Sequence, residues 1–212
     1  MTHRSLAQRL LMLAAPTALA AGGVLLPTSA LAAPMTPHFG TVTTQVGGVS
    51  GHHHHGTATP GVKWVETTDA PSGITFKLPG KPKMQEIPQK EAGDYPARVY
   101  AVPTSDGFMY FLVIDVRGAG PAELKDAVEG TRQGMADDWG GAAVTSQKHN
   151  TVDGRPALDA RFSSTKGDHM VATSLAVADD DHIVQAVTVG PEAKEKSVTE
   201  AQEQAAAGLR IP

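Results

Sequence analysis

The clearest periodicity in the chain begins at Ile74, where apolar and polar residues alternate through Leu78 until Pro79-Gly80 ends the run. Alternation with a period of two is typical of a strand with one buried face. Two further apolar segments, Arg98–Val102 and Phe108–Val116, are separated by a turn that contains Asp106-Gly107. Because Phe108–Val116 is almost wholly apolar, we expect a central strand that is covered on at least part of both faces.

Helical spacing follows this hairpin. The residues on one predicted stripe are Leu124, Ala127, Val128, Thr131, Met135 and Trp139. They predict an amphipathic helix that begins at Gly120-Pro121 and ends at Gly140-Gly141. A second helix is predicted near the C-terminus, where Ser197-Val198-Thr199-Glu200 matches a capping box and Gly208 follows. Leu209 and Ile211 are expected to pack back onto the sheet.

Two more hairpins lie between the predicted helices. The first pairs Val144–Val152 with Ala157–Ser163, and the second pairs Met170–Val177 with Ile183–Val189. Antiparallel hairpins with two separate helices predict an α+β sandwich. We therefore expect an antiparallel sheet of about six to seven strands with two main helices packed on it.

Residues 1–32 have the pattern of a signal peptide. Arg4 and Arg9 precede the apolar stretch Leu10–Leu26, and Ala30-Leu31-Ala32 supplies the small residues of a cleavage site after Ala32. The alternative is an uncleaved membrane anchor, but a proline and a glycine pair interrupt the stretch. No twin arginine is present and no cysteine follows, so the sequence predicts export by the general secretory pathway and a secreted or extracytoplasmic protein.

The sequence then predicts a disordered linker over 33–72 and one folded domain over 73–212. Gly, Thr, Pro and Ser dominate the linker, and such a composition buries too little apolar surface to fold. The linker contains the metal-ligand candidates His52, His53, His54 and His55. Alternate histidines of an extended chain project to the same side, so the run suits weak binding of Zn²⁺, Cu²⁺ or Ni²⁺. The alternative is a polar linker without fixed geometry.

Composition narrows the function classes. The chain has no cysteine, which excludes disulfides, thiolate metal sites and thiol nucleophiles. The formal net charge is −4, and it becomes −6 once Arg4 and Arg9 leave with the predicted signal peptide. A negative mature protein is a poor ligand for nucleic acid or an anionic membrane surface. We therefore expect a protein partner, whose identity and stoichiometry the sequence does not give.

Catalytic signatures are weak. Ser50 lies outside any G-x-S-x-G motif, there is no H-E-x-x-H or phosphate-binding glycine loop, and His149 and His169 lie on predicted strands without a neighbouring nucleophile. Asp179-Asp180-Asp181-His182 lacks the alternating ligand spacing of a calcium loop, which favours a solvated turn. Asp137-Asp138 opposes the helix dipole and is either a partner contact or a solvated surface. We expect a non-catalytic protein without a cofactor.

Two segments carry a family resemblance, Ile74-Thr75-Phe76-Lys77-Leu78-Pro79-Gly80-Lys81-Pro82 and Val152-Asp153-Gly154-Arg155-Pro156-Ala157. Together with the order of elements over 73–212, they resemble the PsbP/Mog1-like α/β/α sandwich domains common in exported bacterial proteins. Several members of that group bind other proteins without catalysis, so the resemblance implies an accessory or protein-binding module. The alternatives are an extracytoplasmic metal-binding protein that uses His52–His55, and an unrecognised hydrolase.

Overall fold

A computed structural model describes residues 63–87, 95–167 and 169–212. The strands in these residues are β1 (Val65–Thr68), β2 (Thr75–Leu78), β3 (Lys83–Ile87), β4 (Ala97–Thr104), β5 (Gly107–Asp115), β6 (Ala142–Val152), β7 (Arg155–Ser164), β8 (Met170–Asp179) and β9 (His182–Pro191). The α-helices are α3 (Pro121–Trp139) and α4 (Glu195–Ala207), and a 3₁₀ turn (Glu192–Lys194) leads into α4. No helix in this part of the chain is both long and apolar enough to cross a bilayer.

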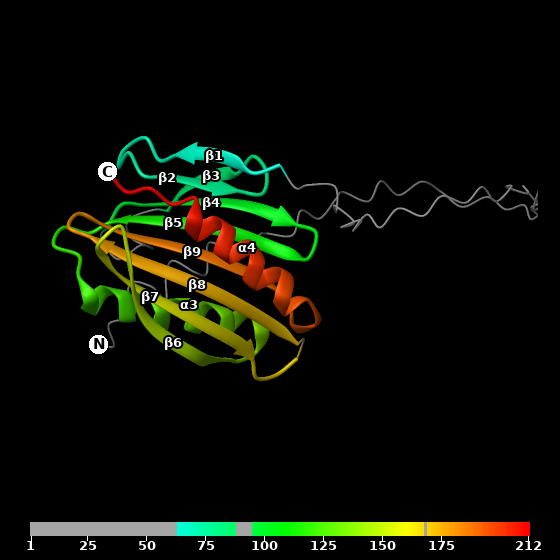
Figure 1. Ribbon diagram of the computed structural model, residues 1–212. Coiled ribbons are helices and arrows are strands. Elements are labelled where there is room, and N and C mark those ends of the chain that lie inside the picture. Colours follow the sequence, from blue (N-terminus) through cyan, green and yellow to red (C-terminus); the bar gives the residue numbers. More distant parts are fainter. Residues whose placement is uncertain (1–62, 88–94, 168) are drawn as a thin grey trace, which may run out of the picture. The chain divides into compact units, whose positions relative to one another are not determined.

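Seven strands form one antiparallel sheet in the order β3-β4-β5-β9-β8-β7-β6, and β1 pairs with β2 as a separate small sheet (Figure 1). The hairpins β4–β5, β6–β7 and β8–β9 are local, whereas the pairing of β5 with β9 joins the two halves of the sheet. Met109–Ile114 of β5 are all buried, so the predicted central strand is confirmed. The predicted α+β class, with two helices on an antiparallel sheet, is also confirmed.

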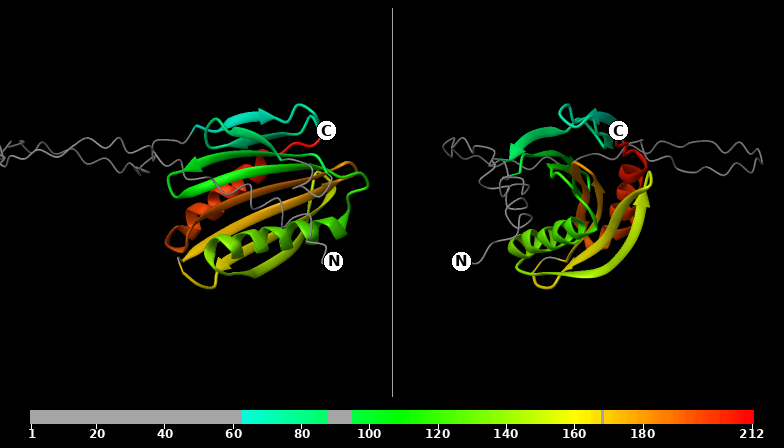
Figure 2. Two further views of the ribbon diagram at one scale, coloured as in Figure 1. Left: turned by 180° about the vertical axis from the view of Figure 1, so that it is seen from behind. Right: turned by 90° about the vertical axis from the view of Figure 1, so that its left-hand side faces the viewer.

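The two helices cover opposite faces of the large sheet. Helix α3 packs over β6–β9, whereas α4 packs over β8 and β9 and also contacts β2 (Figure 2). Successive side chains of a strand point to opposite faces, so β9 divides its apolar residues between two cores. Ile183 and Val187 belong to the core under α3, and Val184 and Ala186 belong to the core under α4 and β2.

A buried glutamine fixes each helix to the sheet. Gln185 of β9 donates from Nε2 to Thr131 Oγ1 of α3 at 2.8 Å and to Ser174 Oγ of β8 at 2.9 Å. On the other face, Gln202 of α4 donates to the carbonyl oxygen of Ala186 at 3.0 Å and accepts from Thr188 Oγ1 at 2.7 Å. Buried polar groups require such partners, so these bonds define where each helix sits along β9.

The folded domain begins earlier than the sequence predicted. The linker was expected to continue to residue 72, but β1 occupies Val65–Thr68 and pairs with β2 in register Val65↔Leu78 to Thr68↔Thr75. Trp64, just before β1, packs against the core under α4. The predicted domain boundary after residue 72 is therefore wrong. The sequence pattern missed β1 because a strand of four residues with two half-buried positions gives too short an alternation to be recognised.

The end of the chain returns to β2. Thr75 and Arg210 exchange backbone hydrogen bonds at 2.9 and 2.7 Å, and Leu209 is 1% exposed. The predicted packing of Leu209 and Ile211 is thus confirmed. The predicted capping box at Ser197 is wrong, because α4 begins at Glu195 and Ser197 lies inside its first turn. The chain enters the helix directly from the sheet, where the Glu192 backbone N–H donates to the carbonyl oxygen of His169 at 2.8 Å.

Candidate functional site

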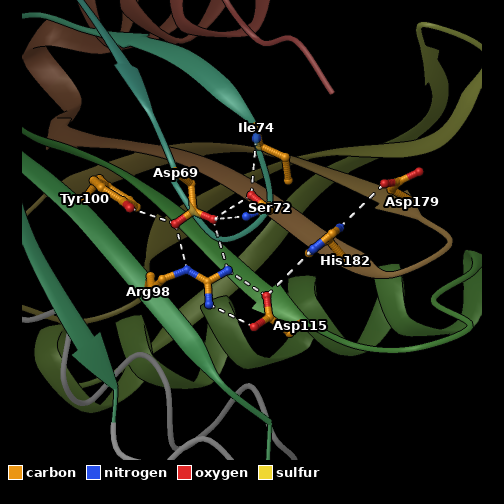
Figure 3. Close-up of polar contacts among 8 residues, drawn as sticks. All are labelled: Asp69, Ser72, Ile74, Arg98, Tyr100, Asp115, Asp179 and His182. Atoms are coloured by element: carbon orange, nitrogen blue, oxygen red, sulfur yellow. Dashed lines mark hydrogen bonds and ion pairs between the residues drawn. The ribbon is translucent and has the colours of Figure 1, made fainter. Parts of the chain in front are cut away.

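Charged side chains meet at one end of the large sheet, on the face that carries β1 and β2. We call six of them the charged row: Asp69, Arg98, Asp115, His182, Asp179 and Arg155. Figure 3 shows all of them except Arg155, which pairs with Asp179. Strand register creates the row, because Asp115 of β5 and Asp179 of β8 both lie opposite His182 of β9. The row crosses five strands and reaches the β1–β2 turn, where Asp69 lies.

Asp69 is the centre of the buried part of the row. It is 0% exposed and accepts from Arg98 Nε at 2.6 Å, Arg98 Nη2 at 3.0 Å and Tyr100 Oη at 2.7 Å. Ser72 adds its Oγ at 2.5 Å and its backbone N–H at 3.2 Å. Five donors therefore saturate one carboxylate. Arg98 completes its fork on Asp115, with Nη1–Oδ2 at 2.9 Å and Nη2–Oδ1 at 2.6 Å.

These contacts set the protonation states. Burial alone would raise the pKa of Asp69, but hydrogen bonds from Arg98, Ser72 and Tyr100 outweigh burial and hold the pKa below its ordinary value. The hydrogen bond to Asp115, followed by the one to Asp69, raises the pKa of Arg98 despite its burial. Burial and the neighbouring Asp69 raise the pKa of Tyr100. At neutral pH the group is therefore a carboxylate, a guanidinium and a neutral phenol.

The other half of the row is less buried. Arg155 Nε donates to Asp179 Oδ1 at 2.9 Å, and its Nη2 donates to the carbonyl oxygen of Pro212. Burial alone would raise the pKa of Asp179, but Arg155 and its other donors hold it below the ordinary value. His182 lies between two carboxylates, with Nδ1 3.6 Å from Asp179 Oδ2 and Nε2 3.8 Å from Asp115 Oδ1. Arg155 therefore links β7 to β8 and to Pro212.

The charged row links strands and turns to one another and does not hold a side chain free to react. The hydroxyl that enters it, Ser72 Oγ, donates to Asp69 instead of facing His182. Asp69 has no free lone pair for a substrate, since five donors already occupy it. Arg98 fixes the β1–β2 turn to β4 and β5, so the charges position the small sheet over the core.

The structure resolves some of the sequence candidates. His52, His53, His54 and His55 lie outside the described residues, so the metal prediction stays a prediction. In the part of the chain that is described, no group of three or more His, Cys, Asp or Glu side chains could hold a metal ion. His149 is exposed, and His169 pairs with Glu192 on the surface, at 3.2 Å between Nδ1 and Oε2.

The predicted acidic turn after β8 divides in two. Asp180 and Asp181 are exposed, as expected of a solvated turn, whereas Asp179 and His182 are half-buried members of the charged row. The turn also holds the loop after β5, because the carbonyl oxygen of Asp181 accepts from the N–H of Val116 at 2.9 Å. The carbonyl oxygen of Asp180 accepts from Gly118 at 2.6 Å. A solvated turn was therefore a correct expectation for only half of the segment.

Asp137 and Asp138 are both exposed at the end of α3. Partial desolvation, followed by the charge of the neighbouring Asp137, raises the pKa of Asp138. The hydroxyl of Tyr110 on β5, a residue that is 2% exposed, has no hydrogen-bond partner among the described residues. Burial, followed by the charge of Asp138, raises the pKa of Tyr110.

Sequence reasoning missed Asp69 and Arg98. A signal for each was present, because Asp69 precedes Ala70-Pro71-Ser72-Gly73, a turn sequence, and Arg98 stands inside an apolar strand. A charged residue in a buried strand requires a partner. The partner could not be named, since 29 positions separate the two residues.

The two edges of the large sheet differ. On β3, Lys83–Glu86 are exposed on both faces, and Met84 is 54% exposed. Tyr95, just before β4, is 40% exposed, and these two are the exposed large apolar side chains of the described domain. On β6, Thr145–Thr151 are exposed and polar, and a register irregularity between Val144 and Ser146 interrupts pairing with β7.

Comparisons with known proteins give resemblance of fold alone. No family model matches the chain, and no curated protein matches it. Cyanobacterial PsbP (CyanoP) from Synechocystis sp. PCC 6803 is 11% identical and covers 73% of this chain and 96% of its own, with a TM-score of 0.46. The Ran-binding protein Mog1p of Saccharomyces cerevisiae is 12% identical and covers 71% and 96%, with a TM-score of 0.46.

A third solved structure is LpqN, involved in cell envelope biogenesis of Mycobacterium tuberculosis. It is 16% identical and covers 71% of this chain and 91% of its own, with a TM-score of 0.43. The fold-level resemblance to PsbP and Mog1 that the sequence indicated is therefore confirmed over roughly the described domain. Function has to be argued from this chain's own surface.

Proposed function

We propose that the protein is an exported, non-catalytic module that binds another protein through the edge strand β3. The observation that carries the proposal is the exposure of Met84, 54%, on a strand whose outer edge pairs with no other described strand. Unpaired edges present free backbone N–H and C=O groups, and an extended segment of a partner can add to them. Met84 would supply an adaptable apolar contact beside those hydrogen bonds.

The opposite edge makes β3 the better candidate. Strand β6 carries an irregularity at Val144/Ser146 and seven exposed polar residues, Thr145–Thr151. Bulges are one device by which proteins protect edges from pairing. Strand β3 has no such irregularity in its register with β4, from Lys83↔Ala101 to Ile87↔Ala97. An apolar side chain on a regular edge favours association there.

The test is site-specific photo-crosslinking in the exporting cell. A photoreactive amino acid replaces Gln85 on β3 in one version and Gln147 on β6 in the matched control, since both glutamines are exposed on edge strands. We expect one discrete adduct from position 85 and none from position 147. The adduct should disappear when Met84→Lys is added to the first version, because a charge replaces the apolar contact.

Two outcomes speak against the proposal. Equal adducts from both edges would mean nonspecific contact, and an adduct that survives Met84→Lys would mean that β3 is near a partner without being its binding edge. Circular dichroism of Met84→Lys confirms that the fold is retained, which is expected because the side chain is exposed.

Export is part of the proposal. The arginines before Leu10–Leu26 and the small residues before Ala33 support cleavage by a signal peptidase and release outside the cytoplasm. An exported domain without cysteine has to hold its layers by core packing and polar contacts alone. The charged row is suited to that task because it links the β1–β2 turn to five strands.

A further inference from the structure

The outer edge of β3, which pairs with no other described strand, can pair with the same edge of a second copy. Two identical edge strands pair antiparallel about a two-fold axis that runs between the two copies of one residue. Side chains that lie opposite each other then share a face of the joined sheet. The residue at the axis therefore decides which side chains meet.

The sequence of β3 favours one position of the axis. An axis at Lys83 or at Glu86 brings two like charges directly opposite each other, which destabilises a sheet. An axis at Gln85 places the apolar Met84 opposite the carboxylate of Glu86. An axis at Met84 instead joins the two methionines and places Lys83 opposite Gln85. Glu86 then lies opposite Pro82, so no like charges are directly opposed.

Met84 has one side that such a pairing would cover. In the register with β4 it lies opposite Tyr100, which is 6% exposed, whereas Met84 itself is 54% exposed. No other described strand lies beside it. An unbranched thioether adapts its shape to an apolar neighbour, so a second methionine is a suitable cover.

Pairing of β3 with itself also closes the assembly. Each copy contributes the same surface to such a contact, so two copies satisfy each other and no third can add. Pairing of β3 with β6 of another copy would be head-to-tail and would continue into a filament. The register irregularity between Val144 and Ser146 and the polar exposed residues of β6 disfavour that alternative.

We propose that the partner of β3 is a second copy of this chain, joined by antiparallel pairing of the two β3 strands with Met84 opposite Met84. This inference rests on the proposed function, because it uses the same edge and names the partner. The two seven-stranded sheets become one continuous sheet. Each copy contributes a strand of five residues, a smaller contact than that of a permanent dimer, so the association depends on concentration.

Cysteine pairing tests the register, because the chain contains no cysteine of its own. Met84→Cys should give a disulfide-linked dimer under mild oxidation, since directly opposed residues have Cα atoms about 4.5–5.5 Å apart, within disulfide range. Lys83→Cys and Gln85→Cys should each stay monomeric alone and should form a mixed dimer when combined, because these two positions face each other. Gln147→Cys on the exposed edge β6 is the matched control and should stay monomeric.

Light scattering of the purified exported protein measures the association without a crosslink. The wild-type mass should rise from one chain towards two with concentration, and Met84→Lys should remain at one chain. A dimer that survives Met84→Lys, or equal disulfide yields from all the cysteine variants, would overturn the β3 pairing.

The photo-adduct from position 85 separates this inference from the proposed function. An adduct with twice the mass of the chain supports the second copy. An adduct of another mass, from a protein that stays monomeric in light scattering, keeps β3 as a binding edge and overturns the second copy. No adduct and no dimer would overturn both.

Discussion

Replacing Asp69 by Asn tests whether the buried half of the charged row holds the β1–β2 layer to the sheet. The change keeps the side chain's shape but removes the charge and turns one acceptor oxygen into an NH₂ donor. That donor would face the N–H and O–H groups of Arg98 and Ser72, which now donate to the carboxylate. Arg98, whose side chain is 7% exposed, would keep only Asp115 as an anionic partner.

The magnitude follows from burial. Removing one partner of a buried ion pair costs roughly 3–5 kcal/mol, because the other charge remains buried without compensation. Arg98 retains Asp115, so we expect the lower end, about 3 kcal/mol. For a domain of about 150 residues this corresponds to a fall in Tm of roughly 6–12 °C. It would be a large share of the 5–15 kcal/mol that is typical of domain stability.

The assay is urea unfolding at neutral pH followed by tryptophan fluorescence. Trp64 packs against the core next to the β1–β2 layer and Trp139 against the core under α3, so the signal covers both faces. The matched control is Glu129→Gln. This change also removes the anionic partner of an arginine, Arg132, but on the surface of α3, where both side chains are at least 30% exposed. It should lose about 0.5 kcal/mol or less. A loss for Asp69→Asn no larger than the control would refute the reasoning.

Three further predictions concern acid, metal and processing. Since the pKa of Asp69 is held below its ordinary value, its contribution is present above about pH 4 and lost as the pH falls further, so the urea midpoints of wild type and Asp69→Asn should converge in acid. Calorimetric titration of residues 33–212 with Zn²⁺ should give weak binding without fixed stoichiometry that is lost when His52–His55 are changed to Ala. A tight stoichiometric site would instead favour metal handling. The intact mass of the exported protein should correspond to a chain that begins at Ala33, and a mass that retains Leu10–Leu26 would favour a membrane anchor.

The elements that the sequence predicted well are those whose signal is local. The apolar run of β5 extends over most of the strand, and the apolar stripe of α3 repeats over several helical turns. Gly140, the residue after α3, has a left-handed conformation with φ 70°. Gly120 donates its N–H to Glu123 Oε2 at 2.9 Å, so the start of α3 was also readable from neighbouring residues. Strands β1 and β3 were missed because four or five residues with several exposed positions leave no clear period.

The charged row could not be predicted, because its hydrogen bonds and ion pairs join residues that are distant in sequence. Asp69 looks like an ordinary turn residue until Arg98 and Tyr100 are placed beside it. For the segment Asp179–His182, the sequence predicted the turn correctly but wrongly placed the first and last residues in solvent. The register of β8 against β9 directs those two side chains inward and leaves the residues between them in solvent. Register is a property of paired strands, and one sequence does not specify it.

The pairing of β5 with β9 has a consequence for the order in which the chain can fold as it emerges from a ribosome or a translocation channel. The hairpin β4–β5 can form early, but the free edge of β5 has to wait until Val189 appears opposite Phe108. The helix α3 and three strands pass in the interval, and the bridge between Thr75 and Arg210 closes only with the last residues. An emerging chain therefore leaves one edge of this apolar strand unpaired while α3 and the strands β6, β7 and β8 are made. Holding factors that bind extended apolar segments should recognise Phe108–Ile114 during that time.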